Sequence, residues 1–278
     1  MTNFDWRSVE GFTNISLPRS VFVGHGQIFV LAEGDRKSGK EEQYLPYPLV
    51  LTFNQEGTLI RVGVLDQGLD PLVLGVFKSG NFVVVSYDRL NNRMALDLIR
   101  PDGTEIRQLS LGSNDYLAQA SKMGPQSMPG KYNSTLLIDM SKFFPFGRNL
   151  LLVPLETSGL PVLNLGEKGV ASAIVPQLPK GMVLDSFIST TSTSLKMRLG
   201  TVVQTQHPAL DSDGKLLSVG TIPSQKITEF SLANGSIVHE DKIGSTAVQP
   251  ACEADGALRL LTSSGTAGKL AVVTARMK

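Results

Sequence analysis

Residues 78–85, with the sequence KSGNFVVV, show the arrangement that decides the fold: a tight turn that ends in glycine leads directly into an apolar strand. The same turn followed by an apolar stretch recurs at residues 24–31, 146–153, 212–219 and 254–261. A second series of glycine turns alternates with the first, at residues 55–57, 101–103, 168–169 and 233–235. Each unit therefore reads strand, turn, strand, loop, strand, turn, strand, which is typical of a repeat protein.

The second unit shows this order of strands most clearly. Residues 71–77 and 81–87 are mostly apolar, while residues 94–100 and 104–111 alternate apolar and polar side chains. Such patterns predict buried and half-buried β-strands. The PDG sequence at residues 101–103 supplies the positive-φ position that a tight hairpin needs, so we expect an antiparallel sheet of four strands.

The spacing of the units indicates the architecture. Corresponding turn glycines lie between 42 and 67 residues apart, and no segment has the sustained 3.6-residue apolar spacing of helical repeats. We therefore expect an all-β protein, a β-propeller of four-stranded antiparallel blades with five clear repeats and five or six blades. Residues 181–200 are either a degenerate extra blade or an insertion before a fourth unit at about residues 201–243.

The two ends of the chain predict how the propeller closes. The last unit has three strands, at residues 247–253, 257–262 and 269–275, and lacks a fourth. Residues 12–17, with the sequence FTNISL, are strand-like and otherwise unplaced. We expect this N-terminal strand to pair with residues 269–275, which would close the ring, cover an exposed strand edge and make residues 1–278 a single domain.

The turns at residues 79–85 (SGNFVVV) and 100–104 (RPDGT) resemble those of the NHL and TolB-like six-bladed β-propellers. The resemblance covers most of the chain and implies a propeller fold. The chain departs from this class in its irregular third unit, at about residues 135–178, and in showing only five clear units. Because the class includes scaffolds, ligand-binding domains, lactonases and lyases, the resemblance implies no particular activity.

Composition excludes several kinds of partner. The 278 residues carry a net charge of +1 with no basic run, so we expect no nucleic-acid binding. The single cysteine, Cys252, rules out an intramolecular disulfide, and the longest apolar stretches, about eight residues, are too short to span a membrane. We expect a monomer, cytoplasmic if Met1 is the true start and periplasmic or secreted if an export signal is missing from this chain.

The two series of tight turns in a propeller share one face, and the loops from second to third strand and from blade to blade share the other. We interpret His25, Asp102, Asp213 and Asp255 as turn residues, because tight turns favour Asp before Gly. Long loops on a rigid scaffold usually carry binding. The polar and aromatic residues that we predict to form a ligand-binding rim on the loop face are Asp35, Tyr44, Asp88, Arg89, Asp115, Tyr116 and Tyr132.

Catalytic residues are not predicted. His25, His207 and His239 fall in a tight turn, near an inner strand and on an outer strand, and the motifs HExxH and GxSxG are absent. We predict no cofactor, although a calcium ion in the axial channel would leave no linear signature and stays open. The sequence favours a non-catalytic propeller that binds a protein or small ligand on the loop face; the alternative is a hydrolase or lyase with a metal in the channel.

Overall fold

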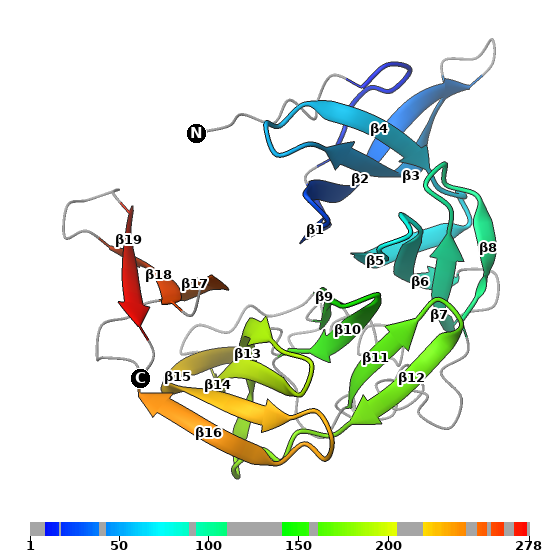
Figure 1. Ribbon diagram of the computed structural model, residues 1–278. Coiled ribbons are helices and arrows are strands. Elements are labelled where there is room, and N and C mark those ends of the chain that lie inside the picture. Colours follow the sequence, from blue (N-terminus) through cyan, green and yellow to red (C-terminus); the bar gives the residue numbers. More distant parts are fainter. Residues whose placement is uncertain are drawn as a thin grey trace. The chain divides into compact units, whose positions relative to one another are not determined.

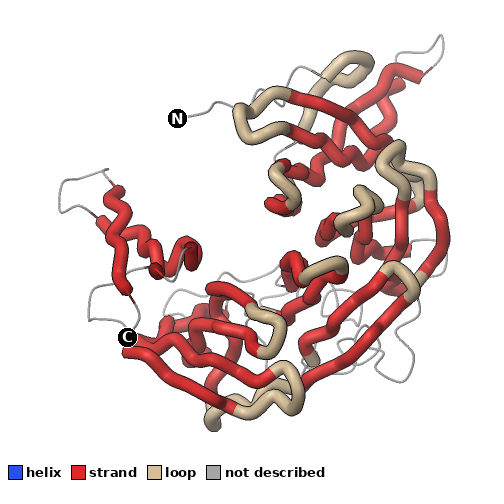
Figure 2. Tube along the Cα trace, in the orientation of Figure 1, coloured by secondary structure: helices blue, strands red, loops and turns tan. Residues whose placement is uncertain are grey.

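The computed structural model describes residues 9–16, 18–38, 43–88, 93–109, 141–155, 161–204, 219–242, 249–254, 257–263 and 270–276 (Figure 1). Within these residues the named elements are all β-strands, joined by the loops and turns that Figure 2 draws in tan. We find in them no helix with the length and apolar character needed to cross a bilayer.

The strands of the described residues form four four-stranded sheets and one three-stranded sheet, each with its strands in chain order. The first sheet comprises β1 (Ser20–Gly24), β2 (Gln27–Ser38), β3 (Gln43–Phe53) and β4 (Leu59–Val64). The second comprises β5 (Leu69–Val76), β6 (Phe82–Asp88), β7 (Arg93–Ile99) and β8 (Glu105–Gln108). The third comprises β9 (Ser141–Phe146), β10 (Asn149–Pro154), β11 (Val162–Gly166) and β12 (Gly169–Ile174). The fourth comprises β13 (Met182–Thr190), β14 (Ser194–Gln204), β15 (Val219–Ser231) and β16 (Ile237–Lys242), and the last β17 (Gln249–Ala254), β18 (Ala257–Ser263) and β19 (Leu270–Arg276).

Each four-stranded sheet is an antiparallel meander, which is the blade of a β-propeller, so the predicted fold class is confirmed. The fourth sheet corrects one prediction. Residues 181–200 are neither an extra blade nor an insertion, because β13 and β14 are the first two strands of that sheet. The turn that joins them lacks glycine and is closed by Thr191, whose hydroxyl accepts the Ser194 N–H at 3.0 Å. The glycine pattern therefore did not predict the β13–β14 turn. The turn predicted at residues 212–214 lies outside the described residues.

The chain divides into two compact units, and each is described by itself. The first unit, residues 1–154 and 161–173, holds the first three sheets. Their first strands, β1, β5 and β9, lie next to one another, while β4, β8 and β12 lie farthest out (Figure 1). The second unit, residues 155–160 and 174–278, holds the fourth and last sheets, whose first strands β13 and β17 are in contact.

Aromatic side chains join the sheets of the first unit. Phe29 of the first sheet meets Phe82 of the second edge to face, with ring centroids 6.1 Å apart. Phe143 of the third sheet packs on the backbone of Gly75 in β5, where a Cβ atom would lie 2.6 Å from its ring. Phe82 is 1% exposed, and full burial of such a side chain stabilises the fold by about 1.5–3 kcal/mol. Packing of neighbouring faces therefore fixes the order of these sheets.

The glycine between third and fourth strands lets the backbone of its turn approach a neighbouring segment closely. Gly103, between β7 and β8, has a φ of +96°, and a Cβ atom there would lie 2.0 Å from the carbonyl oxygen of Val64 at the end of β4. Gly235, between β15 and β16, has a φ of +73°, and its Cβ atom would lie 2.1 Å from the carbonyl oxygen of Val175. Both turns therefore require glycine for their backbone conformation and for their contact.

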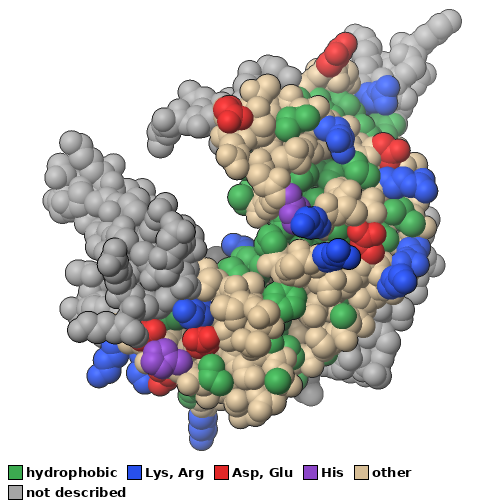
Figure 3. Space-filling view, viewed as in Figure 1, with side chains coloured by type: hydrophobic (Ala, Val, Ile, Leu, Met, Phe, Trp, Pro, Cys, Tyr) green, Lys and Arg blue, Asp and Glu red, His purple; other side chains and the backbone are tan. Residues whose placement is uncertain are grey.

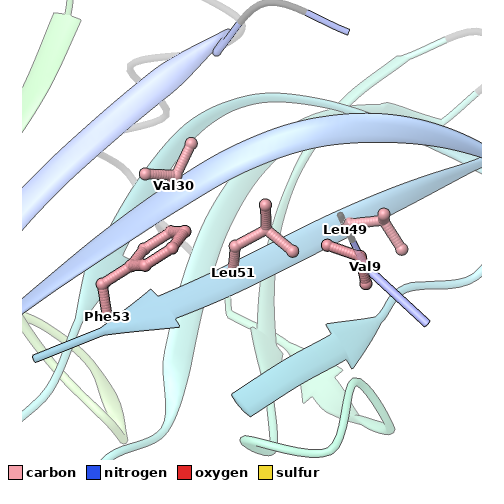
Figure 4. Close-up of a cluster of buried hydrophobic side chains, with 5 residues drawn as sticks. All are labelled: Val9, Val30, Leu49, Leu51 and Phe53. Carbon is pink, nitrogen blue, oxygen red and sulfur yellow. The ribbon is translucent and has the colours of Figure 1, made fainter. Parts of the chain in front are cut away.

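A cluster of buried apolar side chains covers one face of the first sheet (Figure 4). Leu49, Leu51 and Phe53 of β3 are fully buried, and Val30 of β2 lies beside them. The cluster also contains Val9, which is 5% exposed and comes from the segment before β1. The N-terminal segment therefore supplies part of the hydrophobic core.

This N-terminal segment forms backbone hydrogen bonds to β2. The Thr13 N–H donates to the Asp35 carbonyl at 2.9 Å, the Asp35 N–H donates back at 2.8 Å, and the Ser16 N–H donates to the Glu33 carbonyl at 2.7 Å. The prediction paired residues 12–17 with residues 269–275, so the partner strand is corrected for the described residues of the segment. Because β2 extends beyond β1, its backbone groups need a partner, and a segment about twenty residues away in the chain pairs at lower entropic cost than one at the far end.

Candidate functional site

The sheets of the first unit have two ends with different connections. At one end lie the tight turns, which include Gly26, Gly57, Gly80 and Gly103. At the other end lie the connections from second to third strand and from sheet to sheet, such as residues 65–68. We call these ends the turn face and the loop face, and the predicted division is confirmed for the described residues.

One hairpin extends past its neighbours on the loop face. Strands β2 and β3 pair from Ile28 with Phe53 to Ser38 with Gln43. In contrast, β1 begins opposite Leu31 and β4 ends opposite Leu49. Residues 33–38 and 43–48 therefore project as a two-stranded ribbon, here called the hairpin arm. Its inner strand is the one that the N-terminal segment joins.

Side chains of the N-terminal segment hold the hairpin arm. The Phe12 ring meets the Tyr47 ring edge to face, with centroids 6.3 Å apart. The Arg36 guanidinium lies 5.9 Å from the Phe12 ring centroid, an arrangement that contributes about 0.5–1 kcal/mol at an exposed site. The Asn14 amide donates to the Asp35 carboxylate at 3.1 Å. The arm is therefore supported along one edge and presents charged and aromatic groups.

An arginine joins the base of the arm to the second sheet. One nitrogen of the Arg19 guanidinium lies 2.8 Å from the Glu33 carboxylate, and the other lies 2.6 Å from the Asp70 carboxylate. The three side chains are 24–33% exposed, so each ion pair contributes about 1 kcal/mol or less. The planar guanidinium between two carboxylates bridges β2 and β5 on the loop face.

The predicted rim residues have different outcomes. Asp35 is half-buried in the hairpin arm, where it accepts the bond from Asn14. Tyr44 lies on the arm opposite Lys37, and Asp88 ends β6 opposite Leu69, although the structure does not describe either side chain. The backbone of Asp88 therefore lies one residue from Asp70 on the same face. The remaining predicted residues, Arg89, Asp115, Tyr116 and Tyr132, lie outside the described residues.

Sequence reasoning did not select Arg19 and Asp70 for the rim. A signal was available, because each of these residues lies at or just before the start of the first strand of its sheet, Arg19 ahead of β1 and Asp70 in β5. The starts of neighbouring inner strands meet at the loop face. Opposite charges at that repeat position in consecutive units therefore predict an ion pair between sheets.

The described histidines do not converge. His25 occupies the β1–β2 turn with a φ of 55°, and its Nε2 lies 3.1 Å from the Val76 carbonyl oxygen of the next sheet. His239 of β16 lies 3.1 Å from the Asp241 carboxylate. His207 lies outside the described residues. In the part of the chain that the structure describes, no three His, Cys, Asp or Glu side chains are placed to hold a metal ion.

A buried arginine in the second unit has a structural role. Arg198 of β14 is 6% exposed, and its Nε donates to the Ser224 carbonyl at 2.9 Å. Burial holds the pKa of this guanidinium below its usual range, and the Asp185 carboxylate opposes that shift. The bond lies where the register between β14 and β15 shifts, so Arg198 satisfies a carbonyl that the strand ladder leaves without its regular partner.

No known protein family matches the chain, and no curated protein matches its sequence. Among solved structures, the chain is similar to the WD40 domain of Neurospora crassa Pan2, with 10% identity, a TM-score of 0.40 and coverage of 92% of this chain and 74% of that one. BamB from Moraxella catarrhalis has 11% identity, a TM-score of 0.38 and coverage of 89% and 71%. The β-propeller domain of Myceliophteria thermophila Cps50 (Swd1) has 9% identity, a TM-score of 0.35 and coverage of 96% and 100%. These scores are too low to carry an argument, so the assignment of propeller blades rests on the sheets themselves.

Proposed function

We propose that this chain is a non-catalytic binding protein and that its partner, a protein, docks on the loop face around the hairpin arm. The observation that carries the proposal is the length of β2 and β3, which pair as far as Ser38 and Gln43, beyond both neighbouring strands. The base of this ribbon packs on the buried cluster through Tyr47, and its outer part presents the exposed Arg36. The ribbon provides a long, rigid element for recognition.

The chemistry of the arm suits a protein partner. Arg36 is exposed and Tyr47 is half-buried, and residues of these types are enriched at protein interfaces. The carboxylates of Asp35, Glu33 and Asp70 lie in the same region, so the surface combines both charges with aromatic groups. We propose that Tyr44, Asp88, Arg89, Asp115, Tyr116 and Tyr132 extend this surface, as the sequence predicts.

The organisation of the whole chain follows from the same reading of its sheets. The two compact units would belong to a single propeller domain, residues 1–278, of the NHL and TolB-like class. The chain would act as a monomer, presenting one loop face to its partner. In this arrangement the blades hold the arm, and the loops that follow second strands complete the surface.

Site-specific cross-linking in cells of the source organism tests the proposal. A benzoylphenylalanine at position 36 places the cross-linker on the exposed side of the arm, and the same residue at position 172 serves as the control, because Ser172 is exposed on β12 away from the arm. We expect one partner to be captured at position 36 and not at position 172. Capture of a partner at position 172 and not at position 36 would contradict the assignment of the binding surface to the hairpin arm.

A further inference from the structure

The turn between β15 and β16 contains an asparagine followed by a glycine, Asn234 and Gly235, which form the one Asn–Gly pair in the sequence. Such pairs undergo deamidation in water. The backbone nitrogen of the glycine attacks the side-chain carbonyl carbon of the asparagine, ammonia leaves, and a five-membered succinimide ring forms. Water then opens the ring and gives either aspartate or isoaspartate, in which the backbone runs through the side chain. Glycine favours the attack because it has no Cβ atom to obstruct its nitrogen.

The side chain of Asn234 is exposed, but its turn holds it in place. The side-chain carbonyl oxygen accepts the Ser236 N–H at 3.0 Å and the Ser236 hydroxyl at 2.8 Å. These two hydrogen bonds form an Asx turn, so the side-chain carbonyl is directed toward Ser236. Charged side chains are scattered over the visible face of the described residues, among the uncharged polar groups drawn in tan (Figure 3). Asn234 is uncharged, and its deamidation adds a negative charge to the turn.

The attacking nitrogen is engaged as well. The Gly235 N–H donates to the Ser231 carbonyl at 2.9 Å, and Gly235 is buried. This nitrogen attacks only after it loses its proton, so the internal hydrogen bond and the burial both keep a base away from it. The folded turn therefore holds both reacting groups, and the turn must open before the ring forms.

An equivalent turn shows which of the two products the fold accepts. In the β7–β8 turn of the second sheet, Asp102 precedes Gly103, and its carboxylate accepts the Thr104 N–H at 2.9 Å and the Thr104 hydroxyl. These hydrogen bonds match those that Asn234 accepts from Ser236. An ordinary aspartate at position 234 therefore retains the turn.

Isoaspartate does not fit the same place. A Cβ atom at Gly235 would lie 2.1 Å from the Val175 carbonyl oxygen, and the Gly235 carbonyl accepts the Gln177 N–H at 2.8 Å. Isoaspartate adds one carbon atom to the backbone immediately before Gly235. Because closely packed groups leave no room for an extra carbon, this product displaces Gly235 from its contact with residues 175–177.

We propose that Asn234 is a deamidation site that the folded β15–β16 turn protects, and that its conversion to isoaspartate, once the turn has opened, destabilises the fourth sheet. Water is the other reactant and ammonia is released, so the reaction needs no cofactor. The site belongs to the second unit. Deamidation there does not depend on binding at the hairpin arm.

Peptide mapping by mass spectrometry, during incubation of the full chain in mildly alkaline buffer, tests the protection. A synthetic peptide of residues 230–240 gives the deamidation rate of the free sequence in the same buffer. We expect Asn234 in the folded chain to react at least about tenfold more slowly than in the peptide, because the turn must open first. The variant S236A, which removes one hydrogen bond to the Asn234 side chain, should react about threefold faster than wild type.

Two variants control for effects of substitution alone. S172A changes an exposed serine of β12, and S236T keeps a hydroxyl, as Thr104 does in the equivalent turn, so both should react at the wild-type rate. Circular dichroism confirms that each variant is folded. Equal rates in the folded chain and the peptide, or equal rates in S236A and S236T, would overturn the protection by the turn.

Melting temperatures separate the two products. The variant N234D should melt within about 2 °C of wild type, because an aspartate retains the turn. Chains that carry isoaspartate at position 234, obtained by incubation in urea and refolding, should melt more than about 2 °C below N234D or fail to refold. An isoaspartate form that melts with N234D would overturn the destabilisation.

Discussion

Replacing Gly103 with alanine tests the close approach of the first two sheets. The new Cβ atom would lie 2.0 Å from the Val64 carbonyl oxygen and 2.6 Å from its carbonyl carbon, at a φ of +96°. The backbone conformation costs an alanine about 1–2 kcal/mol, and overpacking against a backbone adds about 1–3 kcal/mol. The lower entropy of the unfolded alanine chain offsets about 0.4–1 kcal/mol. We therefore expect the free energy of unfolding to fall by about 2–4 kcal/mol.

Gly147 provides the matched control for this substitution. It also has a positive φ, +62°, and a turn position, but its Cβ atom would meet nothing within 4 Å. Its replacement with alanine should therefore cost only the backbone term, about 1 kcal/mol. Urea denaturation followed by circular dichroism measures both variants against wild type. Equal losses in the two variants would refute the argument that contact with Val64 makes Gly103 necessary.

Three further predictions concern a buried side chain, a turn carboxylate and the metal content of the protein. The variant V9A should lose about 1–2 kcal/mol in the free energy of unfolding, because Val9 is part of the buried cluster, whereas V21A, at a 55% exposed position, should stay within about 0.5 kcal/mol of wild type. Hydrogen bonds from Thr104 lower the pKa of Asp102 below its ordinary value of 3.8. The ionised carboxylate therefore stabilises the fold above pH 3.8, and this stabilisation is lost as the pH falls through the lowered pKa. NMR titration of T104V should show the pKa of Asp102 rising toward 3.8, and an unchanged pKa would contradict the assignment. Elemental analysis of the purified protein should find no stoichiometric metal, and one calcium ion per chain would favour the hydrolase or lyase alternative.

The glycine turns predicted most of the fold because each one requires a backbone angle that glycine adopts readily, and some of them also require a close contact. Gly103 and Gly235 have positive φ values, and each also lies against the backbone of a neighbouring segment. Such positions tolerate no other residue without strain, so they remain readable in the sequence. The β13–β14 turn could not be found in this way, since a threonine hydroxyl replaces glycine there and leaves no comparable signature.

The candidate site was less predictable than the fold. The pairing of the N-terminal segment with β2 depends on how far β2 extends, and strand length is not encoded by the apolar pattern of residues 27–32 alone. Arg19, Glu33 and Asp70 are ordinary surface residues in the sequence, and only the alignment of β1, β2 and β5 makes them one cluster. Asp35 was selected from its loop position and lies on a strand instead. The local pattern of apolar and polar residues does not determine how distant strands align with one another.

The most direct test of the proposed function is hydrogen exchange on the chain with and without the partner captured by cross-linking. We expect binding to slow exchange in the hairpin arm, residues 33–38 and 43–48, and at residues 69–71 beside Arg19. Exchange at the turn glycines Gly57, Gly103 and Gly235 should not change when this partner binds. Protection confined to those turns, with exchange in the hairpin arm unaltered, would contradict the assignment of the loop face.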